Sequence, residues 1–256
     1  MGRMDQNNSA NFILRISNLS KSFGGVKAVV GVGFNLREGE LLGIIGPNGS
    51  GKTTLVNLIT GFLKPDSGKI EYKGQDITGL APYRIARLGI ARTFQMIRPF
   101  AELPSFKNLI IPLYSPRVKG LSGGKYGDLD SVAKDYLEEV GFERESSVTY
   151  KQAGSLPHGY LKRLELAKCL ALRADLIILD ELFSGLSIAE LASIVPIIEK
   201  LVSEGKTVIM IEHRLRELFR IADRVVVLNY GSVIADGIPS EVMEKNEVRK
   251  AYLGSE

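Results

Sequence analysis

The chain has 256 residues, of which 45% are hydrophobic and 24% charged, as is usual for a globular protein with a substantial core. Its longest apolar runs, such as 176–179 and 225–228, are far too short for a membrane-spanning helix of about 20 residues. One cysteine excludes an internal disulfide, two histidines exclude a Cys/His metal cluster, and a net charge of +4 does not argue for nucleic acid as a partner. The polar N-terminus lacks the apolar region of a signal peptide, so we expect a cytoplasmic protein.

The chain opens with patterns typical of strands. We predict a strand at 13–17, a turn at 21–25 and one or two further strands at 26–36. Phe23 lies in the predicted turn. Its ring can stack on a nucleotide base or can be a partly buried turn aromatic, and the spacing alone does not decide between these interpretations.

The glycine-rich stretch 46–54 is the main chemical motif, between a predicted buried strand at 40–45 and a predicted helix at 54–60. It fits the phosphate-binding loop pattern of Gly, four residues and Gly-Lys-Thr. Glycines let backbone N–H groups point at phosphate oxygens, the helix N-terminus adds its positive dipole end, and the lysine reaches the β- and γ-phosphates. The residues predicted to bind the nucleotide are Gly46, Pro47, Asn48, Gly49, Ser50, Gly51, Lys52, Thr53 and Thr54, with the Thr53 hydroxyl as a Mg²⁺ ligand.

Beyond the loop, turns, strands and a short helix alternate. We predict a turn at 64–68, a strand at 69–72, a helix at 82–88 and a strand at 90–94. Gln95 follows the last of these strands. Its amide can bind Mg²⁺ or hold the attacking water, although by itself a solvated glutamine is the simpler interpretation.

The middle of the chain indicates a mainly helical region. Residues 99–127 are rich in Pro, Gly and Ser and predict a loop-rich entry into it. Amphipathic helices are predicted at 128–140 and 160–173.

The segment 176–181 is the second chemical motif. Its four-residue apolar run predicts a buried parallel strand, and Asp180 stands at the carboxyl end, where ligands bind in open α/β sheets. Asp180 can hold Mg²⁺ through water, and Glu181 is suited to accept a proton from an attacking water. Two solvated acids at a strand end are the alternative, which the upstream phosphate loop disfavours.

A further strand is predicted at 206–211, ending just before His213. This strand end should lie beside that of Asp180, where an imidazole can contact the γ-phosphate. A lone histidine is more often structural.

The rest of the C-terminal part supplies scaffold elements. Ser187 and Glu190 fit a capping box, so a helix should begin there, and Pro196 should kink it. A hairpin at 224–235 and a helical tail at 240–253 complete the chain.

These motifs, in this order, resemble the ATP-binding subunit of an ABC transporter over residues 14–254. The resemblance implies an α/β fold, with a P-loop (RecA-like) ATPase core, an antiparallel β subdomain and an inserted helical subdomain. It implies a single ABC ATPase domain over 1–256. Within it, 1–95 and 174–256 form the nucleotide-binding core with the β subdomain, and 96–173 form the helical subdomain.

The resemblance also implies roles for single residues. Glu181, His213 and Gln95 would be catalytic, Phe23 would stack on the base, and Gln95 and Asp180 would join the Mg²⁺ ligands. The implied cofactors are ATP and Mg²⁺. The implied partners are membrane permease subunits and a second ATPase subunit, related or identical, without nucleic acid. The chain would sit at the inner face of the cell membrane, in contact with it only through the permease.

A narrower likeness is visible at 23–29, 85–95 and 251–254, which are similar to importers of branched-chain amino acids. In that group two different ATPase subunits pair beneath two permease subunits.

Two other ATPase types are alternatives. One is the lipopolysaccharide-export type, which has a shorter insert, and the other comprises soluble superfamily members that act on DNA or the ribosome. Neither heptads nor a second phosphate loop supports the soluble type. A regulator that never hydrolyses ATP is disfavoured by Glu181 and His213.

The chain departs from the family at several positions. The family signature Leu-Ser-Gly-Gly-Gln, which reaches across the dimer to the partner's ATP, corresponds to Leu-Pro-His-Gly-Tyr at 156–160. Pro157 offers no hydroxyl and no N–H to a phosphate, which would weaken this contact. The alternative interpretation is that Pro157 only starts the following helix. The signature-like 121–125 comes too early, and we interpret it as a loop. Leu182 and Ser187 replace the family's usual Pro and Asp.

From Pro157 and Ser187, set beside an intact Glu181, we predict an asymmetric heterodimer with one competent site. That site combines this chain's catalytic residues with the partner's signature. The region 98–119 is predicted to face the permease.

Overall fold

The computed structural model describes residues 11–122 and 127–253. It contains a four-stranded antiparallel sheet in the order β2-β1-β4-β5 and a six-stranded sheet in the order β10-β9-β3-β8-β7-β6. The strands are β1 (Phe12–Phe23), β2 (Val26–Arg37), β3 (Leu41–Ile45), β4 (Ser67–Tyr72), β5 (Gln75–Asp76), β6 (Ile90–Arg92), β7 (Leu176–Asp180), β8 (Thr207–Ile211), β9 (Arg224–Asn229) and β10 (Ser232–Gly237).

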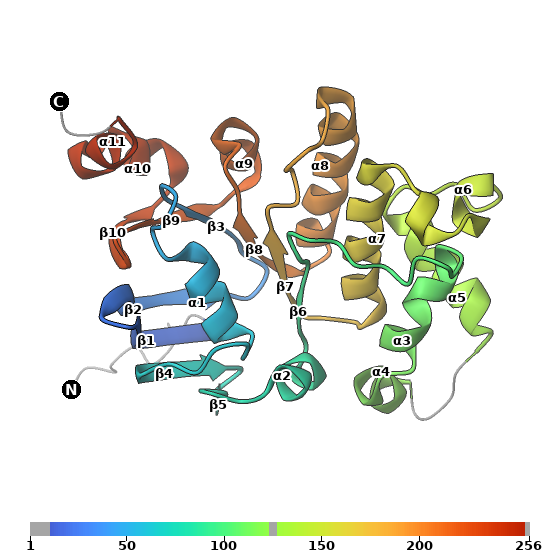
Figure 1. Cartoon of the computed structure of the whole chain (residues 1–256), viewed down its shortest axis with the longest axis horizontal. Coiled ribbons are helices and arrows are strands. Elements are labelled where there is room, and N and C mark those ends of the chain that lie inside the picture. The colour runs from blue at the N-terminus through green and yellow to red at the C-terminus, as the bar shows by residue number, and fades with distance from the viewer. Residues whose placement is uncertain (1–10, 123–126, 254–256) are drawn as a thin grey trace, which may run out of the picture.

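Helices surround the larger sheet, and α3 to α6 gather at one end of the molecule (Figure 1). None of the helices in the described ranges is long and apolar enough to cross a bilayer. The helices are α1 (Lys52–Ile59), α2 (Pro82–Leu88), η1 (Phe106–Leu109), α3 (Ile110–Leu113), α4 (Pro116–Leu121), α5 (Leu129–Glu139), α6 (Ser147–Tyr150), η2 (Ala153–Ser155), α7 (His158–Ala171), α8 (Ile188–Ser203), α9 (Leu215–Ile221), α10 (Pro239–Glu244) and α11 (Asn246–Leu253).

The six-stranded sheet is the middle layer of the molecule. Strands β3, β7 and β8 are buried along their whole length, as expected for parallel strands covered on both faces. Alternate side chains point into two separate cores, so that Leu179 joins the helical side and Ile178 joins the side of α1 and the smaller sheet. The prediction of a P-loop α/β fold with an antiparallel β part therefore agrees with the structure.

Strand register brings the chemical motifs to one edge of this sheet. β7 pairs in parallel with β8, and Asp180 lies opposite Ile211. β3, which leads into the phosphate loop, lies on the other side of β8. The carboxyl ends of these three strands, which precede the phosphate loop, Glu181 and His213, therefore meet at the same edge.

The smaller sheet differs from the prediction in one respect. The turn expected at 21–25 is only Gly24-Gly25, because β1 continues through Phe23 and pairs it with Val26 of β2. Both glycines have positive φ, so two residues suffice to reverse the chain. Residues 26–37 form one continuous strand, which is within the one or two strands predicted there.

Within the predicted loop-rich region 99–127, the described residues 99–122 contain more helix than predicted, namely η1, α3 and α4. Its prolines do not break these helices. Pro116 lies in the first turn of α4, where its missing N–H costs nothing, and the Ser115 hydroxyl caps the same turn. Buried Leu109 and Leu113 anchor the region to the helical core. Helix α7 begins at His158, two residues earlier than predicted, and α9 was not predicted.

Candidate active site

The phosphate loop leads directly into α1. The N-cap residue, Gly51, has a φ of 102° and supplies no side-chain cap, so no side chain competes for the first N–H groups of the helix. A Cβ at Gly51 would lie 2.4 Å from the Ala28 carbonyl oxygen, and one at Gly46 would lie 2.1 Å from that of Leu228. Both positions therefore require glycine, and the open helix start is suited to an anion.

The Lys52 ammonium group is buried within this loop. Its Nζ donates to the carbonyl oxygens of Gly46 and Pro47 over 2.8 and 3.0 Å. Burial lowers the pKa of Lys52, while the nearby charges of Glu181 and Asp180 act in the opposite direction.

A cavity of about 240 Å³ opens beside the loop. It is lined by β2, by the phosphate loop and by the residues after β7 and β8. The lining residues are Val26, Lys27, Ala28, Asn48, Gly49, Ser50, Gly51, Lys52, Thr53, Thr54, Glu181 and His213.

The Glu181 carboxylate lies between the two other predicted catalytic residues. Gln95 Nε2 donates to Glu181 Oε2 over 2.7 Å, and His213 Nε2 lies 3.1 Å from Glu181 Oε1. The three side chains come from the ends of β6, β7 and β8, which are far apart in the sequence. The structure therefore brings the three side chains together, with Glu181 and His213 at the cavity and Gln95 in the groove beside it.

Asp180 forms a buried ion pair that the sequence did not predict. Its Oδ2 lies 2.6 Å from Nη2 of Arg92, and Nη1 of the same guanidinium donates to Asn57. The Asp180 backbone N–H donates to the Thr93 hydroxyl. A signal for Arg92 was present, because it is the one charged residue in the predicted strand at 90–94.

The predicted Mg²⁺ ligands line a neighbouring groove together. Thr53, Gln95 and Asp180 all border it, and Thr53 also borders the phosphate-loop cavity. The donors they offer are a hydroxyl, an amide oxygen and the carboxylate oxygen of Asp180 that does not contact Arg92. Such hard oxygen donors suit Mg²⁺.

Phe23 lies outside the residues that line the cavity. It ends β1, is 46% exposed and has the Lys21 ammonium 5.6 Å from its ring centre. The residues just beyond its turn, Val26 to Ala28, do line the cavity. The structure thus places Phe23 at the exposed end of the adjoining hairpin.

The segment 156–160 forms the start of α7, with Pro157 as N-cap residue and no side-chain cap. His158 Nε2 lies 3.3 Å from the Ser184 carbonyl oxygen, so this segment contacts the loop after Glu181. Of the signature-like stretch 121–125, only Leu121 and Ser122 are described, at the end of α4, and the rest lies outside the described residues.

Two buried ionisable side chains behind Glu181 were not predicted. Lys162 Nζ donates to the Glu181 carbonyl oxygen over 2.8 Å, and burial lowers the Lys162 pKa. Glu212 Oε1 accepts the Phe183 N–H over 2.8 Å, and burial raises the Glu212 pKa to about 8. In the sequence both residues look like ordinary surface charges.

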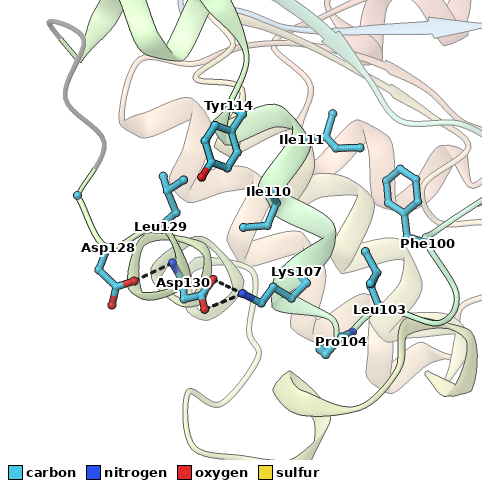
Figure 2. A pocket seen from close by; sticks show the side chains of 11 residues that line it. Phe100, Leu103, Pro104, Lys107, Ile110, Ile111, Tyr114, Asp128, Leu129 and Asp130 are labelled. Atoms are coloured by element: carbon cyan, nitrogen blue, oxygen red, sulfur yellow. Dashed lines mark hydrogen bonds and ion pairs between the residues drawn. The ribbon is translucent and has the colours of Figure 1, made fainter.

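A separate apolar groove of about 830 Å³ lies in the helical region (Figure 2). Leu103, Ile111 and Tyr114 line it, beside an ion pair of Lys107 and Asp130 at 2.8 Å. It falls largely within 98–119, the region predicted to face the permease.

Comparison with known proteins agrees with this geometry. The ABC transporter family model matches residues 29–184, which include the phosphate loop and Glu181. The chain belongs to the ABC transporter family. A solved ATP-binding cassette of an ABC transporter in its ADP conformation superposes on this ABC ATPase with a TM-score of 0.83 and 33% identity, covering 95% of this chain and 99% of the other.

The names of several relatives of this ABC ATPase specify the transported solute. The high-affinity branched-chain amino acid transport ATP-binding protein BraF of Pseudomonas aeruginosa is 37% identical over 252 residues, 94% of this chain and 98% of the relative. The corresponding LivG protein of Escherichia coli strain K12 is 34% identical with the same coverage. The resemblance to an ABC ATPase of the branched-chain amino-acid type is thus confirmed.

Proposed function

We propose that this chain binds and hydrolyses ATP to power a membrane importer for branched-chain amino acids or related small polar solutes. The observation that carries the proposal is the Glu181 carboxylate, held between Gln95 and His213 at the cavity of the phosphate loop. The names of the BraF and LivG relatives support this class of solute.

The phosphate groups of ATP would lie against the open start of α1. The Lys52 ammonium, now bound to loop carbonyls, would exchange them for the β- and γ-phosphate oxygens. Phe23 would reach the base from the hairpin end. Thr53, Gln95 and Asp180 would hold Mg²⁺, which neutralises phosphate charge when it is bound.

Glu181 would act as the general base. Its carboxylate would accept a proton from the water that attacks the γ-phosphate, and Gln95 would hold that carboxylate in place. His213, on the other carboxylate oxygen, would contact the γ-phosphate. Arg92 holds the Asp180 carboxylate in place next to this group through their buried ion pair.

We propose a cytoplasmic location at the inner membrane face, with a second ATPase subunit and permease subunits as partners. The Pro157 N-cap leaves the start of α7 without a hydroxyl or N–H at that position, so its contribution to a partner's site would be weak. Ser187 likewise offers no charge. A heterodimer with one competent site fits this asymmetry.

The test is ATP-driven dimerisation of a Glu181→Gln variant, measured by sedimentation with and without Mg²⁺. Blocking proton transfer should trap the ATP-bound closed dimer. If the variant dimerises alone, the dimer is a homodimer; if it dimerises only after a related ATPase subunit is added, the dimer is a heterodimer. The matched control, Glu199→Gln, changes an exposed acid on α8 and should leave turnover normal. Turnover by Glu181→Gln at the wild-type rate would contradict the proposal.

A further inference from the structure

Lys162 is a buried lysine whose role is not explained by packing. It lies in the second turn of α7, and only 2% of its surface is exposed. Its Nζ donates a hydrogen bond of 2.8 Å to the Glu181 carbonyl oxygen. A buried ammonium loses its hydration, so a residue serving only to fill the core would be apolar.

The backbone of Glu181 is in an unfavourable conformation. Its φ is +50°, in the left-handed region that side chains other than glycine rarely adopt. Such a conformation persists only where surrounding contacts hold it. The Glu181 N–H donates to the Ile211 carbonyl over 2.9 Å, and the Ser184 N–H donates to the Glu181 carbonyl over 3.2 Å.

Lys162 adds the charged contact to this turn. It is bound to the same carbonyl oxygen that Ser184 reaches, and at 2.8 Å its hydrogen bond is the shorter of the two. On the far side of the turn, the buried Glu212 carboxylate accepts the Phe183 N–H. The turn is thus held from two sides by the buried side chains of Lys162 and Glu212.

We propose that Lys162 is a positioning residue for Glu181. By binding the Glu181 carbonyl, it holds the left-handed turn that presents the carboxylate to Gln95, His213 and the phosphate-loop cavity. Among the described residues that line this cavity, Lys162 does not appear, so it acts through Glu181 and not on the nucleotide. The assignment rests on the proposed function, in which Glu181 is the base.

The test compares Lys162→Met with Lys162→Arg and with the control Lys206→Met. Lys206 also donates its Nζ to a backbone carbonyl, that of Ala174 at 3.1 Å, but near the opposite end of β7. ATP turnover is measured on the dimer that the sedimentation experiment identifies, with the affinity for a fluorescent ATP analogue as a second readout. Circular dichroism and thermal unfolding check the fold of each variant.

We expect Lys162→Met to lower kcat by about tenfold or more, with KM and nucleotide affinity changed by less than about twofold. Lys162→Arg keeps a charged donor and should recover a large part of kcat. Lys206→Met should match the wild type. If Lys162→Met does not fold, Lys162→Gln replaces it, because its shorter side chain cannot reach the Glu181 carbonyl in the same way.

Turnover by Lys162→Met within about twofold of the wild type would overturn the assignment. A second outcome would also overturn it, namely equal losses of kcat in the Met and Arg variants accompanied by matching losses of thermal stability. That result would indicate a purely structural role for Lys162. A Glu181→Gln control separates the two levels of the proposal. If it is inactive while Lys162→Met is fully active, only the role of Lys162 fails; if it turns over normally, the proposed function itself fails.

Discussion

The site at residue scale is shaped by charges that are buried as well as by those that face the cavity. Asp180 is paired with Arg92, so removing either partner would leave the other charge buried and uncompensated. Lys162 and Glu212 lie behind the Glu181 turn, with backbone groups as hydrogen-bond partners. These contacts make the geometry of Asp180 and Glu181 depend on residues that do not line the phosphate-loop cavity.

Glu212 should make the stability of the protein depend on pH. Its pKa is raised to about 8 in the folded protein, chiefly by burial, with Lys162 opposing the shift and Glu181 and Asp180 adding to it. Between about pH 4.5 and pH 8 the unfolded chain releases this proton while the folded protein keeps it. The contribution of Glu212 to folding stability is therefore full below this window and is lost as the pH rises through it.

Glu212→Gln should consequently show a smaller loss of stability from pH 5 to pH 8 than the wild type. Its amide oxygen can still accept the Phe183 N–H, so the fold should persist. Denaturant unfolding at four pH values measures the effect. Identical pH dependence in the two proteins would show that Glu212 is ionised throughout.

At the scale of single elements, sequence patterns predicted the structure correctly where contacts between residues close in the sequence determine it. The capping box at the start of α8 is present with both of its hydrogen bonds, and Pro196 lies inside that helix as predicted. The helix at Pro82–Leu88 has the predicted bounds. The errors came where tertiary packing decides, as in the short helices within 99–127, which are held by buried side chains of the helical core.

Ser187→Ala tests the α8 cap. The Ser187 hydroxyl accepts the Glu190 N–H, and the Glu190 carboxylate accepts the Ser187 N–H in return. Losing the hydroxyl should lower the free energy of unfolding by about 1 kcal/mol. Ser203→Ala is the control, because that hydroxyl donates only to the Lys200 carbonyl at the other end of α8. Equal effects of the two changes in denaturant unfolding would contradict the assignment of the cap.

At the scale of the whole molecule, the phosphate loop and the helical region occupy different parts of one chain (Figure 1). Several large apolar side chains of the helical region, such as Ile111 and Tyr114, are exposed and not part of the core. Ile111 is 61% exposed and borders both the groove of Figure 2 and the groove beside Gln95. This arrangement favours the region 98–119 as the permease contact.

Ile111→Asp should weaken the complex with the permease subunits. Because the side chain is exposed, the fold and ATP binding should be unaffected, while the fraction that co-purifies with the permease should fall by about tenfold. Ile238→Asp is the control, since it is also exposed but lies next to α10, away from the helical region. Co-purification of the Ile111 variant at the wild-type level would count against this surface.

The sequence by itself determined the phosphate loop, the buried strands and the acids at their ends. These features follow from local rules, namely glycine spacing, apolar runs and the meeting of parallel strand ends at one edge. Only the tertiary structure decided which charges are buried. Arg92 meets Asp180 across 88 positions, and Lys162 meets Glu181 from a different helix. A charged side chain takes its role from the groups around it, and those groups come from distant parts of the chain.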